Sequence, residues 1–212
     1  MSQPRTQPEA GARPGTGWTG KLPSRGDFVS RRVPGSFREP WERWLGVVLA
    51  GSRQALRERW STAFLQTPAW RFLLERGAVD GTAWAGLLMP SVDSVGRYYP
   101  LTAVCALPPT PLDPGATLLR ASEWYEALEA IALGALSPGA DLESLDAALG
   151  GLSFPAEAIE PASANATARS AWLAEASEIF GRRLLLCDGL PSAEQYEEML
   201  TGEPAARERS RA

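Results

Sequence analysis

Apolar side chains recur along this chain in two patterns, one typical of helices and one typical of buried strands. From Trp41 to Trp60 they fall three and four positions apart, which is the spacing of one helix face. Compact apolar runs at 70–74, 83–89 and 101–107 are bounded by glycine or proline, and such runs are typical of strands buried on both faces. We expect these three strands to form the centre of a sheet.

The sequence before and after these strands predicts further strands and helices. Residues 17–22 and 27–32 are expected to be strands separated by a turn at 23–26, where proline and glycine occur. Helical spacing of apolar residues from Thr117 to Leu136 predicts a second long helix that packs on the sheet. Asp141 follows a Pro-Gly pair and is expected to cap a third helix.

The C-terminal third is expected to add two helices and one strand. Residues 162–180 have an alanine-rich middle that favours helix, with Trp172 to bury. Residues 184–187 predict a strand, and Ser192 with Gln195 has the spacing of a capping box for a last helix. Because helices alternate with strands and are numerous enough to cover both sheet faces, we predict the α/β class and a single three-layer α/β/α sandwich.

Length and composition favour one domain. The 212 residues are 44% apolar, which is enough for one sizeable core and too little for two ordinary domains with linkers. We expect a disordered lead at 1–16, an α/β domain at 17–202 and a charged tail at 203–212. The lead lacks the apolar stretch of a signal peptide or anchor, and no later run reaches the roughly 20 apolar residues that span a bilayer.

The two cysteines and the net charge limit the kinds of partner and the cellular compartment that we expect for this protein. Cys105 and Cys187 lie in apolar runs, so we expect buried thiols, a reducing compartment and a cytoplasmic protein. The net charge of −4 argues against a nucleic-acid partner, which would require a basic face. Residues 1–108 carry 14 basic and 8 acidic side chains, and 109–212 carry 7 and 17. This asymmetry predicts internal pairing or a partner that approaches from one side.

The absence of histidine shortens the list of possible chemistries. It excludes Ser-His-Asp and Cys-His nucleophile systems and histidine-ligated metal sites. Gly15–Lys21 has the glycine spacing of a phosphate-binding loop, but Leu22 stands where that loop needs Ser or Thr, and no apolar strand precedes it. We therefore expect no cofactor and no metal, and carboxylate chemistry is the remaining catalytic option.

Two segments, at 20–29 and 90–102, combine residues that bend the backbone with fixed charges. Each holds an aspartate close to an arginine, Asp27 near Arg25 and Asp93 near Arg97. Structural pairing, contact with a partner and catalysis are all possible roles, although pairing would keep each carboxyl ionised and unsuited to general-acid work. We expect the two segments to converge and to present their charges outward as a docking face. The candidate partner-binding residues are Lys21, Arg25, Asp27, Arg31, Ser91, Asp93 and Arg97.

The same segments carry a family resemblance. The motifs are Gly-Lys-Leu-Pro at 20–23, Gly-Asp-Phe-Val at 26–29, Trp41 with Trp44, Pro-Ala-Trp-Arg-Phe at 68–72 and Pro-Ser-Val-Asp-x-Val-Gly-Arg-x-Tyr-Pro-Leu-Thr at 90–102. With these motifs the chain resembles the TagF (ImpM-like) family of type VI secretion-associated proteins, closely from about residue 18 to 107 and again, more weakly, near 189–200.

This resemblance implies a non-catalytic accessory protein that represses type VI secretion after translation. The implied action is to bind and sequester a forkhead-associated scaffold protein, beside a kinase and phosphatase circuit in which it does no chemistry. Two alternatives stay open from the residues alone. One is a permanent structural subunit of the secretion machine, and the other is an enzyme that uses Asp27 or Asp93.

Overall fold

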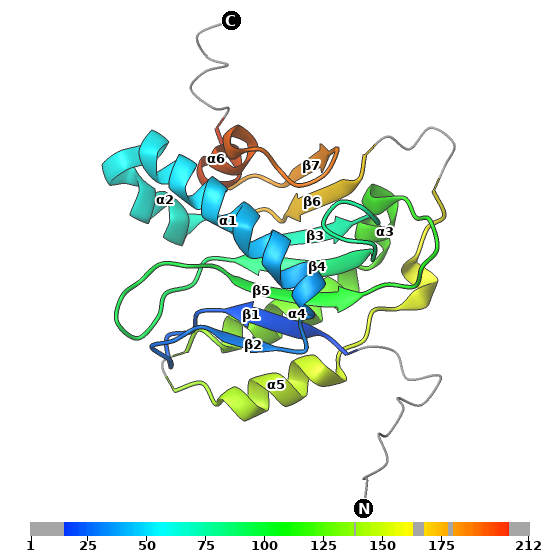
Figure 1. Ribbon diagram of the computed structural model, residues 1–212, viewed down its shortest axis with the longest axis horizontal. Coiled ribbons are helices and arrows are strands. Elements are labelled where there is room, and N and C mark those ends of the chain that lie inside the picture. The colour runs from blue at the N-terminus through cyan, green and yellow to red at the C-terminus, as the bar shows by residue number, and fades with distance from the viewer. Residues whose placement is uncertain (1–14, 138, 163–167, 178–179, 204–212) are drawn as a thin grey trace, which may run out of the picture.

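The apolar runs assemble into one antiparallel sheet within a mixed α/β fold (Figure 1). The computed structural model describes residues 15–137, 139–162, 168–177 and 180–203. Within these residues the sheet has seven strands in the order β2-β1-β5-β4-β3-β6-β7, and every neighbouring pair is antiparallel. The strands are β1 Gly17–Gly20, β2 Val29–Arg31, β3 Trp70–Leu74, β4 Trp84–Met89, β5 Leu101–Ala106, β6 Ser170–Ala174 and β7 Arg183–Cys187.

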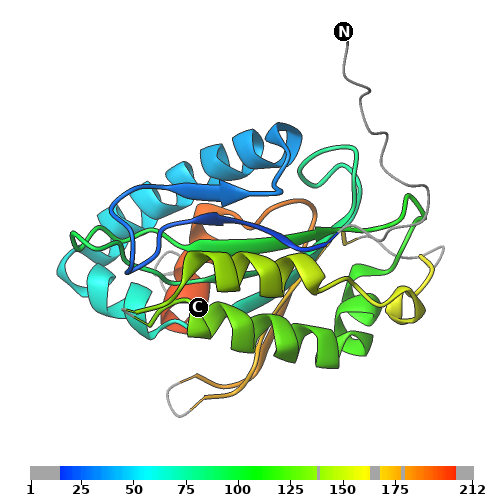
Figure 2. The same cartoon turned by 90° about the horizontal axis from the view of Figure 1, so that it is seen from below.

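Helices pack against both sides of this sheet. They are α1 Gly35–Leu56, α2 Trp60–Gln66, α3 Pro114–Arg120, α4 Ser122–Gly134, α5 Leu142–Gly151 and α6 Ala193–Thr201, with short 3-10 turns at Arg57–Arg59 and Ala156–Ala158. Figure 2 shows α1 on one side of the sheet and α4 with α5 on the other. The expectation of helices combined with one sheet is therefore confirmed as a mixed α/β fold.

Alternate residues of the strands enter two separate hydrophobic clusters, as the period of two along a strand requires. Leu73, Ala85 and Ala103 join the cluster that α3, α4 and α5 complete. Phe72, Trp84 and other residues of the opposite face join the cluster of α1, α2 and α6. The three predicted central strands are therefore buried on both faces, and this burial explains their continuous apolar sequence.

Helix boundaries follow local capping. Asp141 accepts a hydrogen bond from the backbone N of Ser144, and Ser192 forms the expected capping box with Gln195, so both predicted caps are confirmed. The single helix predicted at 117–136 is wrong in extent. Asp113 caps a separate helix, α3, and the helical conformation is interrupted at Ala121 before α4 begins.

The helix predicted for residues 162–180 is also wrong. Residues 163–167 and 178–179 lie outside the described residues, but Ser170–Ala174 is strand β6, paired with both β3 and β7. Ala171 and Leu173 enter one cluster, whereas Trp172 and Ala174 enter the other. Pairing on both edges and burial on both faces thus override the helix propensity of the alanines.

The structure describes little of the predicted lead and tail. Residues 1–14 and 204–212, most of the predicted lead and tail, lie outside the described residues, whereas Thr16 is buried and hydrogen-bonded to Leu152. Both cysteines are buried and form no disulfide, as predicted, and burial raises the pKa of each thiol. No helix in the described part of the chain has the length and apolar character needed to cross a bilayer.

Candidate functional site

The sheet order brings the two charged segments to the same end of the molecule. β1 lies between β2 and β5, and its pairing with β5 sets Thr19 opposite Thr102. Because the strands are antiparallel, the connection that leaves β1 and the connection that enters β5 meet at this end of the sheet. We name residues 20–28 the first loop and residues 90–100 the second loop. The prediction that the two segments converge is confirmed.

A buried ion pair joins the two loops. Lys21 Nζ lies 2.6 Å from Asp93 Oδ2, and the two side chains are only 8% and 0% exposed. Ser91 adds a second link, since its hydroxyl donates a hydrogen bond to the Lys21 carbonyl oxygen at 2.6 Å. The buried ion pair and this hydrogen bond therefore hold the two loops together.

Asp93 also organises the second loop from within. Its Oδ1 accepts hydrogen bonds from the backbone N of Val95 at 3.1 Å and of Arg97 at 2.8 Å, and its Oδ2 accepts one from Arg97 Nε at 2.7 Å. The Arg97 guanidinium then donates to the carbonyl oxygen of Gly26 in the first loop. Both carboxylate oxygens thus have donors, and one aspartate holds the turn at 93–97 as well as the junction of the loops.

The donors around Asp93 keep it ionised. Burial is the largest single influence on this carboxyl and by itself would raise its pKa. The hydrogen bonds from the Lys21 ammonium, from the Arg97 backbone and side chain and from the Val95 backbone outweigh burial, so that the pKa lies well below its ordinary value. A carboxylate in this state serves structure and binding better than proton donation.

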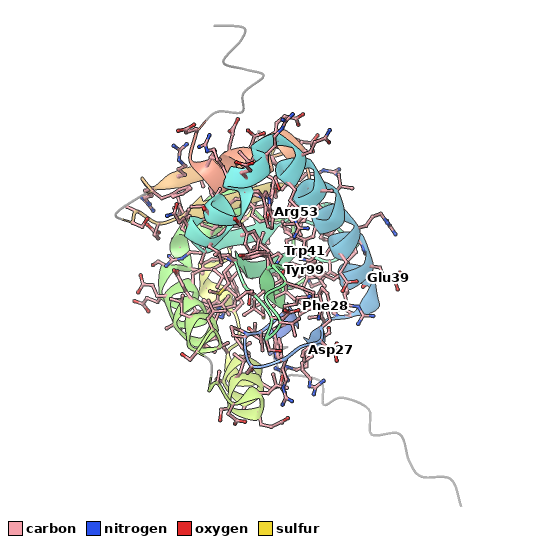
Figure 3. The ribbon with its side chains drawn as sticks, turned by 90° about the vertical axis from the view of Figure 1, so that its left-hand side faces the viewer. Asp27, Phe28, Glu39, Trp41, Arg53 and Tyr99 are labelled. Atoms are coloured by element: carbon pink, nitrogen blue, oxygen red, sulfur yellow. The ribbon has the colours of Figure 1, made fainter. Side chains whose placement is uncertain are left out.

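Aromatic side chains cover the junction on its outer side. The rings of Phe28 and Tyr99, one from each loop, meet edge to face with their centroids 4.5 Å apart. The Lys21 ammonium lies 5.4 Å from the centroid of the Phe28 ring. Phe28 is nevertheless 50% exposed. In Figure 3 Asp27, Phe28 and Tyr99 follow one another along this end of the molecule.

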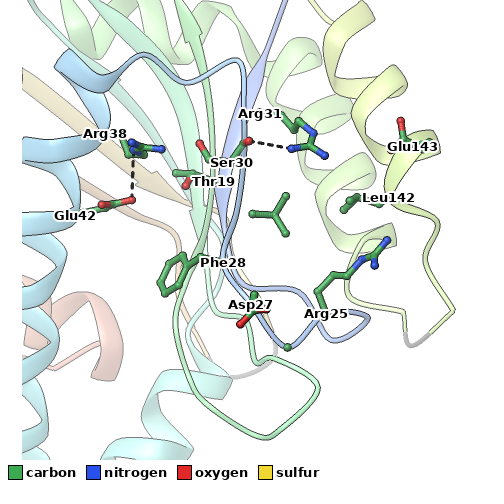
Figure 4. Close-up of a pocket in the computed structure, with 12 residues that line it drawn as sticks. Thr19, Arg25, Asp27, Phe28, Ser30, Arg31, Arg38, Glu42, Leu142 and Glu143 are labelled. Carbon is green, nitrogen blue, oxygen red and sulfur yellow. Dashed lines mark hydrogen bonds and ion pairs between the residues drawn. The ribbon is translucent and has the colours of Figure 1, made fainter.

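A depression of about 770 Å³ lies beside the first loop and reaches the start of α5. Figure 4 shows Arg25 and Arg31 on the side that faces Leu142 of α5, and Phe28 on the opposite side with Arg38. Arg38 is held by Glu42 one helical turn later, at 3.9 Å. Half of the lining residues are charged and two more carry hydroxyl groups, so the depression offers hydrogen-bonding groups to a ligand surface more than apolar area. Its lining residues are Thr19, Arg25, Gly26, Asp27, Phe28, Val29, Ser30, Arg31, Arg38, Glu42, Leu142 and Glu143.

Comparison with known proteins identifies the family. Residues 17–152 match the family described as TagF N-terminal domain, Type VI secretion system-associated. The chain belongs to the TagF family. The matched segment runs from β1 to the end of α5, so it contains both loops and the depression beside them. A comparison with functionally curated proteins finds no match.

A solved structure extends the likeness beyond the segment that defines the TagF family. PA0076 from Pseudomonas aeruginosa PAO1, known from a crystal structure, is 35% identical to this chain with a TM-score of 0.79. The comparison covers 89% of this chain and 94% of PA0076. Because this coverage exceeds residues 17–152, the similarity includes part of the region after α5.

Within this TagF-family site, the predicted residues fall into a buried group and an exposed group. The expectation that these residues all face outward is wrong for Lys21, Ser91 and Asp93, which are 7%, 3% and 3% exposed. Their polar atoms are needed to join the loops, because an unpaired polar group in the core would be costly. The exposed group consists of Arg25, Asp27, Arg31 and Arg97.

The two possible Asp-Arg pairings have different outcomes. Asp93 pairs with Arg97 and also with Lys21. Asp27 is exposed, and no ion pair to Arg25 is found among the described residues. Its carboxylate is thus turned to solvent at the rim of the depression (Figure 4).

Sequence reasoning missed the contact that fixes α5 beside this TagF-family site. Asp146 on α5 accepts a hydrogen bond from the Trp18 indole at 2.9 Å and forms an ion pair with Arg32 at 2.8 Å. Both donors come from the β1 and β2 region, and Arg32 has φ 53, a left-handed conformation uncommon for a residue with a side chain. The excess of basic residues in the first half was the available signal, but it could not single out Asp146.

No metal-binding group is found among the side chains that the structure describes. Nowhere in them do three acidic or cysteine side chains come close enough together to hold an ion. The residues of the site are instead donors and acceptors matched to each other at the junction and open to solvent at the rim.

Proposed function

We propose that this protein restrains type VI secretion after translation, by binding a component of the machine and holding it away from the apparatus. A forkhead-associated scaffold protein is the component we propose, and the cytoplasm is the compartment. The observation that carries the proposal is the match of residues 17–152 to the TagF family, which contains both loops. The action requires only occupancy of a surface, without chemical change in the partner.

The two groups of site residues suit different parts of this action. Lys21, Ser91 and Asp93 position the loops from inside, because their polar atoms are already paired with each other or with backbone. Arg25 and Arg31 are exposed, and Arg31 makes a long surface hydrogen bond to the Ser30 carbonyl oxygen at 3.4 Å. Both can turn to a partner, because arginine forks bind two oxygen atoms of a carboxylate or phosphate at once. The half-exposed ring of Phe28 adds an apolar contact on the opposite side of the depression (Figure 4). We propose that an acidic or phosphorylated partner surface is recognised here.

A non-catalytic role is supported by the state of the acidic residues. Asp93 has donors on both oxygens and a lowered pKa, so it is poorly suited to general-acid work. Asp27 stands exposed in a lining that contains no cysteine, and the other two carboxylates there, Glu42 and Glu143, come from α1 and α5 and not from its own loop. We also propose the three-layer α/β/α sandwich as the scaffold of the surface, because α1, α2 and α6 share one cluster with the sheet and α3, α4 and α5 share the other.

Deletion of the gene separates a repressor from a structural subunit. Loss of a repressor should raise secretion of type VI substrates, measured in culture supernatants, whereas loss of a necessary subunit should abolish it. Affinity capture with the intact protein should then recover the forkhead-associated scaffold protein at high occupancy. Abolished secretion on deletion would overturn the proposal and favour the structural subunit.

Charge reversal tests the surface itself. The double variant Arg25→Glu with Arg31→Glu should weaken binding of the captured partner by about tenfold or more in calorimetry, because each arginine supplies charge-assisted hydrogen bonds. Arg59→Glu is the matched control, since Arg59 is exposed at a 3-10 turn away from the depression. Equal affinities for the double variant and the control would exclude this face as the docking surface.

A further inference from the structure

The two edges of the sheet differ in how well they are protected. At one edge β2 is three residues long and carries Ser30 and Arg31, and short charged edge strands resist pairing with other chains. At the other edge β7 has five residues, three of them consecutive leucines. Among the described strands, only β6 pairs with β7, so its outer backbone edge is open.

The leucines of β7 are exposed although their strand neighbours are not. Leu184 and Leu186 are 50% and 52% exposed. They stand opposite Leu173 and Ala171 of β6, which are buried in the cluster of α3, α4 and α5. Figure 2 shows the β6–β7 hairpin extending past α4, away from the body of the protein. An open edge with exposed leucines is a template for strand addition.

We propose that a second copy of this chain pairs with β7 in antiparallel orientation, about a two-fold axis at Leu185. In that register Leu184 of each copy lies opposite Leu186 of the other, so the exposed leucines cover each other. Arg182 of each copy lies opposite Asp188 of the other. On the face of the strand that carries residues 182, 184, 186 and 188, the sequence is therefore complementary to itself in reverse, as a two-fold interface requires, while Arg183 lies opposite Cys187 on the other face.

The charges at the two ends of β7 argue for a second copy over an unrelated strand. Asp188 is 84% exposed on its side chain and Arg182 is 58% exposed. Among the described residues of their own chain they form only surface ion pairs, Asp188 with Arg169 at 3.6 Å and Arg182 with Glu175 at 3.2 Å. Exposed pairs of this kind contribute little to stability, so both side chains can turn to a partner at small cost. The proposal is independent of the proposed function.

A charge swap tests the register. The intact protein should sediment as a dimer in a concentration series. Asp188→Arg should weaken the self-association by about tenfold, because two symmetry-related pairs change from attraction to repulsion. Arg182→Asp combined with Asp188→Arg restores opposite charges across the axis and should restore the dimer. Leu133→Arg is the control, because Leu133 is an equally exposed leucine, but on α4.

A cysteine at the axis gives a second readout that does not depend on charge. Residues that face each other across antiparallel strands have Cα atoms about 4.5–5.5 Å apart, within the range of a disulfide. Leu185→Cys should therefore form a disulfide-linked dimer on mild oxidation, while Leu133→Cys should not. A monomeric wild-type protein at all concentrations, or a dimer that survives Asp188→Arg unchanged, would overturn the proposal.

Discussion

Lys21 Nζ and Asp93 Oδ2 lie 2.6 Å apart, although 72 positions separate the two residues in the sequence. The pair closes a connection between the loop that follows β1 and the loop that precedes β5. Because both charges are out of water, each depends on the other to offset the cost of burial. The exposed arginines near the pair thus lie on loops that cannot move apart without exposing one of the two paired charges to water or leaving it buried without a partner.

Removal of Asp93 should destabilise the protein strongly. Asp93→Ala leaves the Lys21 ammonium buried without its partner, which we expect to lower the free energy of unfolding by about 3–5 kcal/mol. Lys21→Met should cost less, because Arg97 and two backbone N–H groups still hold the carboxylate. Urea unfolding measures both changes. Asp27→Ala, at an exposed site, should stay within about 0.5 kcal/mol of wild type, and an equal loss in Asp27→Ala and Asp93→Ala would contradict the role of the pair.

Asp93 should also make stability depend on pH in acid. Its folded pKa lies below the ordinary value of 3.8, so the unfolded chain binds a proton at a higher pH than the folded chain does. The stabilisation is therefore present above that ordinary value and is lost as the pH falls through and below it. Wild type and Asp93→Asn should differ most in free energy of unfolding near neutrality and converge below about pH 4. Asp141 and Asp146 also have lowered pKa values, but both proteins contain them. A constant difference across this range would contradict the assignment.

Two glycines should respond to alanine in opposite directions. Gly20 has φ +142, and an added Cβ would lie 2.5 Å from the Pro100 carbonyl oxygen, so Gly20→Ala should push the first loop away from the second and destabilise by about 1–3 kcal/mol. Gly46 lies exposed in α1 with nothing near its added Cβ, so Gly46→Ala should stabilise by about 0.5–1 kcal/mol. Thermal unfolding compares the two variants directly. Similar shifts in melting temperature would argue against the close approach at Gly20.

Trp172 should be among the most costly residues to truncate. Its ring stacks over that of Trp41 with centroids 6.1 Å apart and lies 5.1 Å from the Phe72 ring. Trp172→Ala should lower the free energy of unfolding by about 3–5 kcal/mol, measured by urea unfolding followed by circular dichroism. Leu65→Ala serves as the control, because that side chain is 51% exposed on α2. If residues 162–180 formed an exposed helix instead of including β6, the two losses would be alike.

Much of the fold could be predicted because local and global signals agree. Strands β3, β4 and β5 are buried on both faces, so their sequences are apolar throughout and bounded by turn residues. The caps at Asp141 and Ser192 were predictable because a side chain that accepts from a backbone N–H acts within three residues. Strand β6 could not be predicted in this way. Its residues favour helix locally, and only pairing with β3 and β7 makes them a strand.

The position of the site could be predicted from the sequence, but the exposure of its residues could be predicted only in part. Glycine, proline and charge marked both loops, and their convergence followed once the strands paired as neighbours. The sequence could not tell that Asp93 would be buried, because burial depends on Lys21 from a loop 72 positions away. Asp146 was missed for the same reason. Its contacts with Trp18 and Arg32 join residues far apart in the sequence, and they depend on where α5 packs.

The aromatic cluster around Trp41 has a consequence for any fragment cut at the family boundary. The TagF-matched segment stops at residue 152, yet Trp172 of β6 and Tyr196 of α6 complete the cluster that contains Trp41. Ending the polypeptide there would leave the open edge of β3 and a broad aromatic face bare to solvent, which favours aggregation. Recombinant pieces of this protein should therefore retain the sequence through α6 if they are to behave as independent folding units.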